Sequence, residues 1–172
     1  MDFVDAVTRH LCRTLTRVEA EGLLAGTELL STDAGSTVIR EGTVSEGIYF
    51  LFEGKVEVNR RRHDGETTRL ALVDAPSLFG ELSLVVGGAS TATVSALTDC
   101  RLRLLRKSDF HARLAEGDLA AYKLLGAVAE VLARRVLRLN DTILELSERA
   151  HAAAPMEDLA RLRQKLFSEW SF

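Results

Sequence analysis

The chain has 172 residues, of which 47% are hydrophobic and 27% are charged, which suits one compact domain with appended helix. Its formal net charge of −3 argues against a general nucleic-acid-binding or anionic-membrane surface. No apolar run reaches the roughly 18–20 residues that cross a bilayer. The amino terminus lacks the pattern of a secretory signal, and Cys12 and Cys100 lack metal-ligand spacing, so we expect a cytoplasmic protein.

The first segment has apolar residues at helical spacing, with Gly22 as a stop signal. These residues are Phe3, Val4, Val7, Leu11, Leu15 and Val18. The spacing predicts one amphipathic helix over residues 1–22.

From Glu28 to Leu105 the pattern changes to short β-prone runs that turn residues separate at short intervals. Such a pattern predicts a β-sandwich or barrel, similar to a jelly roll, over residues 23–107. Within it, Lys55–Arg60 alternates polar and apolar side chains, and Asp64-Gly65 is a strong hairpin turn before Thr67–Leu72. We expect these two runs to be paired antiparallel strands.

A dense cationic run, Arg60-Arg61-Arg62, lies at the predicted end of this hairpin. It is either a solvated turn or a place where an acidic partner or a phosphate docks.

Helices are predicted over residues 108–150. Ser108-Asp109 can cap a short helix, and Gly117-Asp118 can start a long one that runs to about Arg149. The long helix has an apolar heptad seam, which favours a parallel homodimer; the alternative is that the seam packs on the β-roll of its own chain. We expect that packing for the first two turns. The predicted dimerisation residues are Leu125, Ala129, Leu132, Val136, Leu139, Ile143 and Leu146.

The remaining residues, 151–172, predict a short amphipathic helix from Met156 to Trp170. It either packs within the protein or binds a partner protein. One short helix does not make a helix-turn-helix, so we expect no direct DNA binding and an output through another protein.

Two stretches carry a resemblance to a known family. Phe79-Gly80-Glu81 leads into a short apolar helix, a glycine pair and the strand Thr91-Ala92-Thr93-Val94, and Val38–Val56 has a glycine turn, an aromatic-aliphatic strand and a second glycine. Together they resemble the cyclic-nucleotide-binding domains of the bacterial catabolite activator family. The resemblance implies a β-roll with flanking helices and, as ligand, cyclic AMP or cyclic GMP.

The resemblance also implies a set of ligand-binding residues. Glu81 would accept a hydrogen bond from the ribose, and the amides of Gly80–Leu82 would hold the phosphate. The full set is Phe79, Gly80, Glu81, Leu82, Ser90, Thr91, Ala92, Thr93 and Asn140.

Ser90 stands where the family has its phosphate-binding arginine. A guanidinium gives two charge-assisted hydrogen bonds, whereas a serine gives one neutral bond. We therefore expect a regulatory and interaction module with weak or absent cyclic-nucleotide binding. The alternatives are a different small ligand, or a stand-alone sensor that uses a substitute cation. The candidate cations are Arg40, Arg101 and, from a dimer mate, Arg134 or Arg135.

The sequence gives no support for an enzyme. His10, His63, His111 and His151 are scattered without metal-ligand spacing, and neither cysteine has a nucleophile signature. We expect no catalytic residues and no metal.

Overall fold

The computed structural model describes residues 2–151. The chain divides into two compact units, Met1–Val128 and Ala129–Phe172. The predicted tail helix, Met156 to Trp170, lies outside the described residues.

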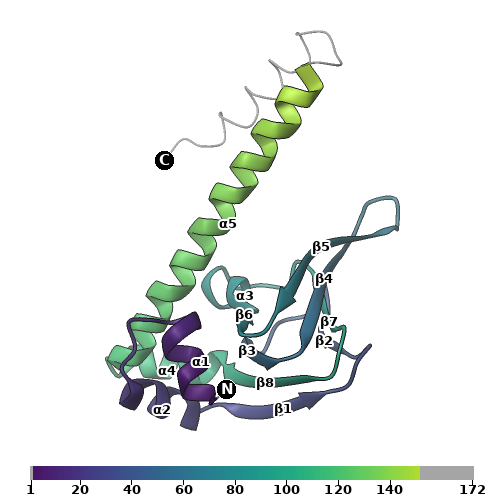
Figure 1. Cartoon of the computed structure of the whole chain (residues 1–172). Coiled ribbons are helices and arrows are strands. Elements are labelled where there is room, and N and C mark those ends of the chain that lie inside the picture. Colours follow the sequence, from purple (N-terminus) through teal and green to yellow (C-terminus); the bar gives the residue numbers. More distant parts are fainter. Residues whose placement is uncertain (1, 152–172) are drawn as a thin grey trace. The chain divides into compact units, whose positions relative to one another are not determined.

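Two four-stranded antiparallel sheets form the centre of the first unit (Figure 1). The first sheet has the order β1 (Glu28–Thr32), β8 (Cys100–Arg106), β3 (Gly47–Glu53) and β6 (Ser77–Phe79). The second has the order β2 (Thr37–Ile39), β7 (Thr93–Ala96), β4 (Lys55–Arg61) and β5 (Thr67–Asp74). The predicted β-roll is confirmed.

The inward-facing side chains of both sheets make one core. Strand β3, which pairs with β8 and β6 on its two sides, is buried along most of its length. Within the core, Tyr49 and Phe79 stack with ring centroids 5.3 Å apart. Burying each large apolar side chain stabilises the fold by about 1.5–3 kcal/mol, so this core fixes the position of β6 and the segment that follows it.

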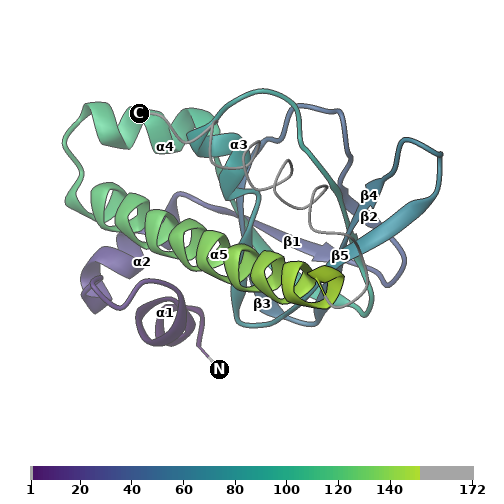
Figure 2. The ribbon, with the colours of Figure 1, turned by 90° about the horizontal axis from the view of Figure 1, so that it is seen from above.

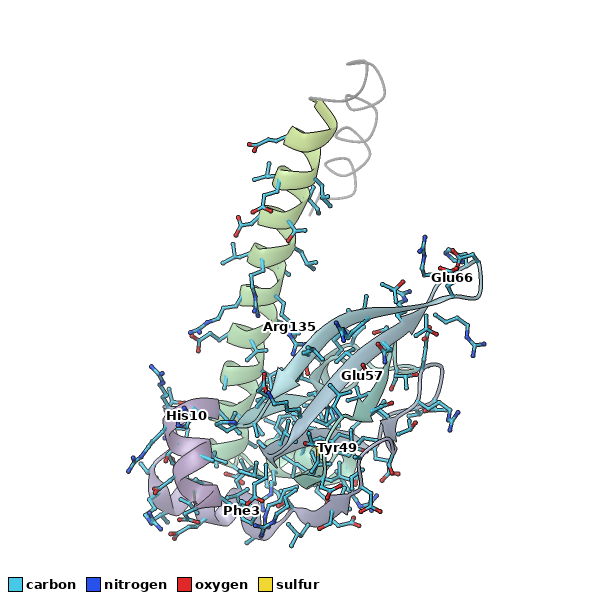
Figure 3. The ribbon with its side chains drawn as sticks, turned by 45° about the vertical axis from the view of Figure 1, so that its right-hand side comes forward. Phe3, His10, Tyr49, Glu57, Glu66 and Arg135 are labelled. Atoms are coloured by element: carbon cyan, nitrogen blue, oxygen red, sulfur yellow. The ribbon has the colours of Figure 1, made fainter. Side chains whose placement is uncertain are left out.

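The predicted hairpin is also present, as β4 and β5. In Figure 3 it carries Glu57 on β4 and Glu66 at its turn. A bulge after Val58 pairs Asn59 with Arg69, and the register ends with Arg61 opposite Thr67. Because side chains alternate along a strand, Val56 and Val58 face the core while Asn59 and Arg61 face away from it.

The amino-terminal segment folds as two helical pieces where the sequence predicts one. Helix α1 (Phe3–Ala6) continues into a π-helical turn, η1 (Val7–Leu11), and α2 covers Arg17–Ala25. The separation follows from a capping box, in which Thr16 accepts the N–H of Glu19 while the Glu19 carboxylate accepts the N–H of Thr16. The helix therefore continues through Gly22.

Two further helices follow the roll, α4 (Lys107–Ala115) and α5 (Leu119–His151). Helix α4 begins one residue before Ser108, and no side chain caps it, so the predicted Ser108-Asp109 cap is absent from the structure. Asp118 does hold the start of α5, where its Oδ1 accepts the N–H of Ala120 at 2.8 Å. None of the helices in the described residues is long and apolar enough to cross a membrane.

The first part of α5 belongs to the first unit, and Figure 2 shows it beside α1 and α2. Its buried residues are Ala120, Ala121, Leu124 and Val128. Lys123 Nζ binds both carboxylate oxygens of Glu19 at 2.7 and 2.8 Å, which ties α5 to α2. The packed face is thus offset from the predicted seam, which starts at Leu125.

The second unit contains the rest of α5. Val131 and Leu132 are half-buried in the single chain, and the large apolar side chains from Val136 to Leu146 are exposed. They include the predicted dimerisation residues Val136, Leu139, Ile143 and Leu146.

Candidate ligand-binding cassette

The candidate site begins where β6 turns into the short helix α3 (Glu81–Val85). Gly80 makes this turn with a φ of 83°, a conformation that side chains other than glycine rarely adopt. A Cβ at this position would lie 2.6 Å from the carbonyl oxygen of Gly47, which real Cβ atoms do not tolerate. The close approach to β3 therefore fixes the start of α3 against the core.

Glu81, the first residue of α3, is only 2% exposed. A buried carboxylate needs hydrogen-bonding or charged partners, and it offers only acceptor oxygens when it is ionised. Of its neighbours, Phe79 is buried against Tyr49, whereas Leu82 is exposed. The predicted sugar-binding carboxylate thus lies inside the protein.

Ser90 lies in the loop that returns from α3 to β7. Its N–H donates to the carbonyl of Thr43 and its carbonyl accepts from the N–H of Gly42, both at 2.8 Å. The side chain is 8% exposed, and its Oγ has no hydrogen-bond partner. The backbone of Ser90 is therefore held on both sides, and its side chain carries one neutral, unpaired hydroxyl.

The remaining predicted residues of the cassette are spread over different environments. Thr91 is exposed and Ala92 is half-buried. Thr93 accepts the N–H of Glu41 through Oγ1 at 3.1 Å and lines a cavity that contains neither Glu81 nor Ser90. Asn140 is exposed and belongs to the second unit.

Of the candidate substitute cations, Arg101 donates to the Glu53 carboxylate at 2.8 Å, and Arg134 pairs with Glu130. Arg40 lines the same cavity as Thr93. The Ser90 Oγ accepts no hydrogen bond from Arg40 or Arg101.

The sequence analysis did not select Lys107, the first residue of α4. A Cβ built on Gly87 would lie 3.9 Å from Lys107 Nζ, so this ammonium group is beside the glycine pair that follows α3. The two residues are far apart in the sequence, and only the folded chain brings them together.

Other chemistry near the cassette is limited. Burial raises the pKa of Tyr49 above its ordinary value. Among the described residues, no group of three or more histidine, cysteine, aspartate or glutamate side chains is arranged to hold a metal ion.

Comparison with known proteins agrees with this geometry. The model of the cyclic nucleotide-binding domain family matches residues 29–116. The chain is 30% identical over 112 residues to a CRP-like cAMP-activated global transcriptional regulator of Mycobacterium tuberculosis. This match covers 65% of this chain and 48% of that relative. The chain is also 34% identical over 112 residues to the cyclic AMP receptor protein of Thermus thermophilus. This match covers 65% of this chain and 50% of that relative.

Among solved structures, the amino-terminal domain of a transcriptional regulator from Streptomyces coelicolor A3(2) is 34% identical, with a TM-score of 0.65. The match covers 83% of this chain and 95% of that domain. This chain spans about half the length of the curated relatives it matches. It belongs to the cyclic nucleotide-binding domain family.

Proposed function

We propose that this chain is a non-enzymatic regulatory and interaction module whose cassette binds cyclic AMP and cyclic GMP weakly or not at all. The observation that carries the proposal is the buried neutral hydroxyl of Ser90. The sequence resemblance aligns this residue with the family's phosphate-binding arginine. Buried Glu81 retains the acceptor for a sugar hydroxyl, but a cyclic phosphate brings a negative charge that Ser90 does not neutralise.

The expected loss of affinity is large. Two hydrogen bonds to a charged group contribute roughly 1.5–3 kcal/mol each, and one neutral hydrogen bond contributes about 1 kcal/mol. The difference is at least about 2 kcal/mol. At 1.4 kcal/mol for each tenfold change in affinity, this weakens binding by at least about 30-fold, and by about 100-fold for a difference of about 3 kcal/mol, when the rest of the pocket is intact.

Calorimetric titration of the full chain with cyclic AMP and cyclic GMP, each to millimolar concentration, tests this part of the proposal. Heats no larger than those of dilution, or a millimolar isotherm, are expected. Saturable binding in the low micromolar range would contradict it.

A stand-alone cyclic-nucleotide sensor is the second candidate. The position of the Lys107 ammonium group beside Gly87 supports it, because a cation from α4 can substitute for the missing guanidinium. This candidate predicts micromolar binding that Lys107→Ala abolishes. If Lys107→Ala leaves a micromolar affinity unchanged, this substitute cation is eliminated.

The output of the module, we propose, passes through protein contacts of a homodimer. The exposed seam of α5 supports this part, because a seven-residue apolar repeat buries its side chains best against a second helix. Leu139 on the seam is 61% exposed, and Leu137, off the seam, is 63% exposed.

These two leucines give a matched test by sedimentation equilibrium. Leu139→Glu should convert the dimer to a monomer, and Leu137→Glu, which makes the same change at similar exposure, should leave it dimeric. A wild-type chain that is monomeric at tens of micromolar would overturn the dimer.

A further inference from the structure

A cavity of about 420 Å³ lies at one end of the second sheet. Its lining is polar and cationic and comes from the ends of β4, β5 and β7 and from the segment after β2. The lining residues are Arg40, Glu41, Asn59, Arg61, Thr67 and Thr93.

The strand register places this cavity on the outer face of the sheet. Val58 pairs with Val94, and both contribute to the core. The next pair, Asn59 with Thr93, must face the other way because side chains alternate along each strand. We call this cavity the outer pocket; it is separate from the cassette residues, apart from Thr93.

The arginine run Arg60-Arg61-Arg62 divides among three environments. Arg61 lines the outer pocket opposite Thr67. Arg60 is the neighbour that alternation turns to the opposite face. Arg62 pairs with Asp64 and Glu66 at the hairpin turn, the end of the hairpin that Glu66 marks in Figure 3.

In the part of the chain that the structure describes, many arginines pair with carboxylates, including Arg62 at the hairpin turn, but the arginines that line or flank the outer pocket do not. Within residues 2–151, the guanidinium groups of Arg40 and Arg61 have no hydrogen bond or ion pair, while Arg17, Arg101 and Arg106 are bound to carboxylates. Arg69 also lacks a partner there, and it pairs in register with Asn59, so it lies on the outer face next to the pocket. Unpaired like charges that share one surface repel each other and attract an anion.

The carboxylate of the pocket, on Glu41, makes no ion pair with these cations among the described residues, so the lining keeps a net positive charge. Glu41 Oε2 accepts the backbone N–H of Arg61 at 2.9 Å, and the Glu41 N–H donates to Thr93 Oγ1 at 3.1 Å. Glu41 thereby connects the segment after β2 to β4 and β7. This arrangement holds the backbone of Arg61 in place and leaves both guanidinium groups to face the cavity.

We propose that the outer pocket binds a small phosphate-bearing molecule. A guanidinium binds a phosphate through two parallel hydrogen bonds, and the pocket holds two such groups. The amide of Asn59 and the hydroxyl of Thr67 add donors and acceptors for the uncharged part of the molecule. The volume falls in the range of small-molecule sites. The proposal does not depend on the cassette.

Calorimetric titration of the full chain with inorganic pyrophosphate at low ionic strength tests the site, with citrate as a carboxylate probe. Saturable pyrophosphate binding, tighter than that of citrate, is expected. Arg40→Ala and Arg61→Ala should each weaken it roughly 10- to 100-fold. The matched control is Arg60→Ala, which removes the same charge from the adjacent residue on the opposite face and should change affinity less than about threefold.

Absence of saturable pyrophosphate binding would overturn the proposal. An equal loss in Arg60→Ala would also overturn it, since the attraction would then come from net charge. Equal affinity for citrate would overturn the assignment to phosphate. Ser90→Ala, which alters the cassette alone, should leave pyrophosphate affinity unchanged, so failure of this site is distinguishable from failure of the proposed function. Melting temperatures of all variants identify any that lose the fold.

Discussion

Ser90 and Ser45 are both buried, but only the Ser45 hydroxyl has a hydrogen-bond partner, so substitution by alanine should change stability in opposite directions at the two positions. Ser90 is 8% exposed and its Oγ has no partner, whereas Ser45 is 5% exposed and its Oγ donates to the Gly47 carbonyl at 3.2 Å. Ser90→Ala removes a buried hydroxyl that lost its hydrogen bonds to water on folding. Ser45→Ala removes a hydrogen bond that the folded chain makes.

The expected changes in the free energy of unfolding follow from the cost of an unpaired buried hydroxyl and from the contribution of one hydrogen bond. A buried polar group without a partner costs about 1–3 kcal/mol, so Ser90→Ala should stabilise the chain by about 1 kcal/mol after the small loss of packing. A net hydrogen bond contributes about 0.5–1.5 kcal/mol, so Ser45→Ala should destabilise it by about 1 kcal/mol. For a chain of this size, each kcal/mol shifts the melting temperature by roughly 2–4 °C.

Thermal and urea unfolding, followed by circular dichroism, measure both variants against wild type. Ser90→Ala should melt above wild type and Ser45→Ala below it. A melting temperature of Ser90→Ala at or below that of Ser45→Ala would refute the reasoning, because the Ser90 hydroxyl would then make a contact that stabilises the native state. A stabilising Ser90→Ala would mean that the chain keeps a buried hydroxyl at a cost in stability, as functional sites do.

Two further predictions concern stability. Gly80→Ala should destabilise the chain by about 1–3 kcal/mol more than Gly35→Ala. The two glycines have nearly the same φ, 83° and 85°, but only a Cβ at Gly80 would meet backbone, at 2.6 Å from the carbonyl oxygen of Gly47. Equal losses of stability in urea unfolding would contradict the close approach. The pKa of Glu19 is lowered to about 2 by hydrogen bonds from Lys123 and from the Thr16 N–H, so its contribution to stability is complete above pH 4.5 and is lost as the pH falls towards 2. Glu19→Gln should therefore flatten the decline of stability across this window, and an unchanged pH profile would show that the Lys123 contact is absent in solution.

Much of the fold follows from local sequence signals. The β4–β5 hairpin rests on one alternating run and an Asp64-Gly65 turn, and the order of glycines and apolar residues around Glu81 is sufficient to identify the cassette. These features depend on short spans of residues, where turn chemistry and side-chain alternation decide the structure.

Other features depend on contacts between distant segments. The helical spacing of residues 1–22 concealed the capping box of Thr16 and Glu19, although Thr-x-x-Glu is a readable helix start. The face of α5 that packs in the first unit contains Leu124 and Val128. Contacts of Lys123 with Glu19 of α2 and with Cys12 select this face, and the heptad seam does not reveal the choice. The outer pocket combines residues from four separated segments, so no local pattern indicates it.

The most direct test of the account is the affinity for cyclic AMP of Ser90→Arg relative to wild type, measured by calorimetry. Ser36→Arg, at an exposed serine away from the cassette, controls for the added charge. If Ser90 limits the cassette, Ser90→Arg should bind about 100-fold more tightly than wild type, and Ser36→Arg should not differ from it. A folded Ser90→Arg variant with no gain, or a wild type that already binds in the low micromolar range, would contradict the account.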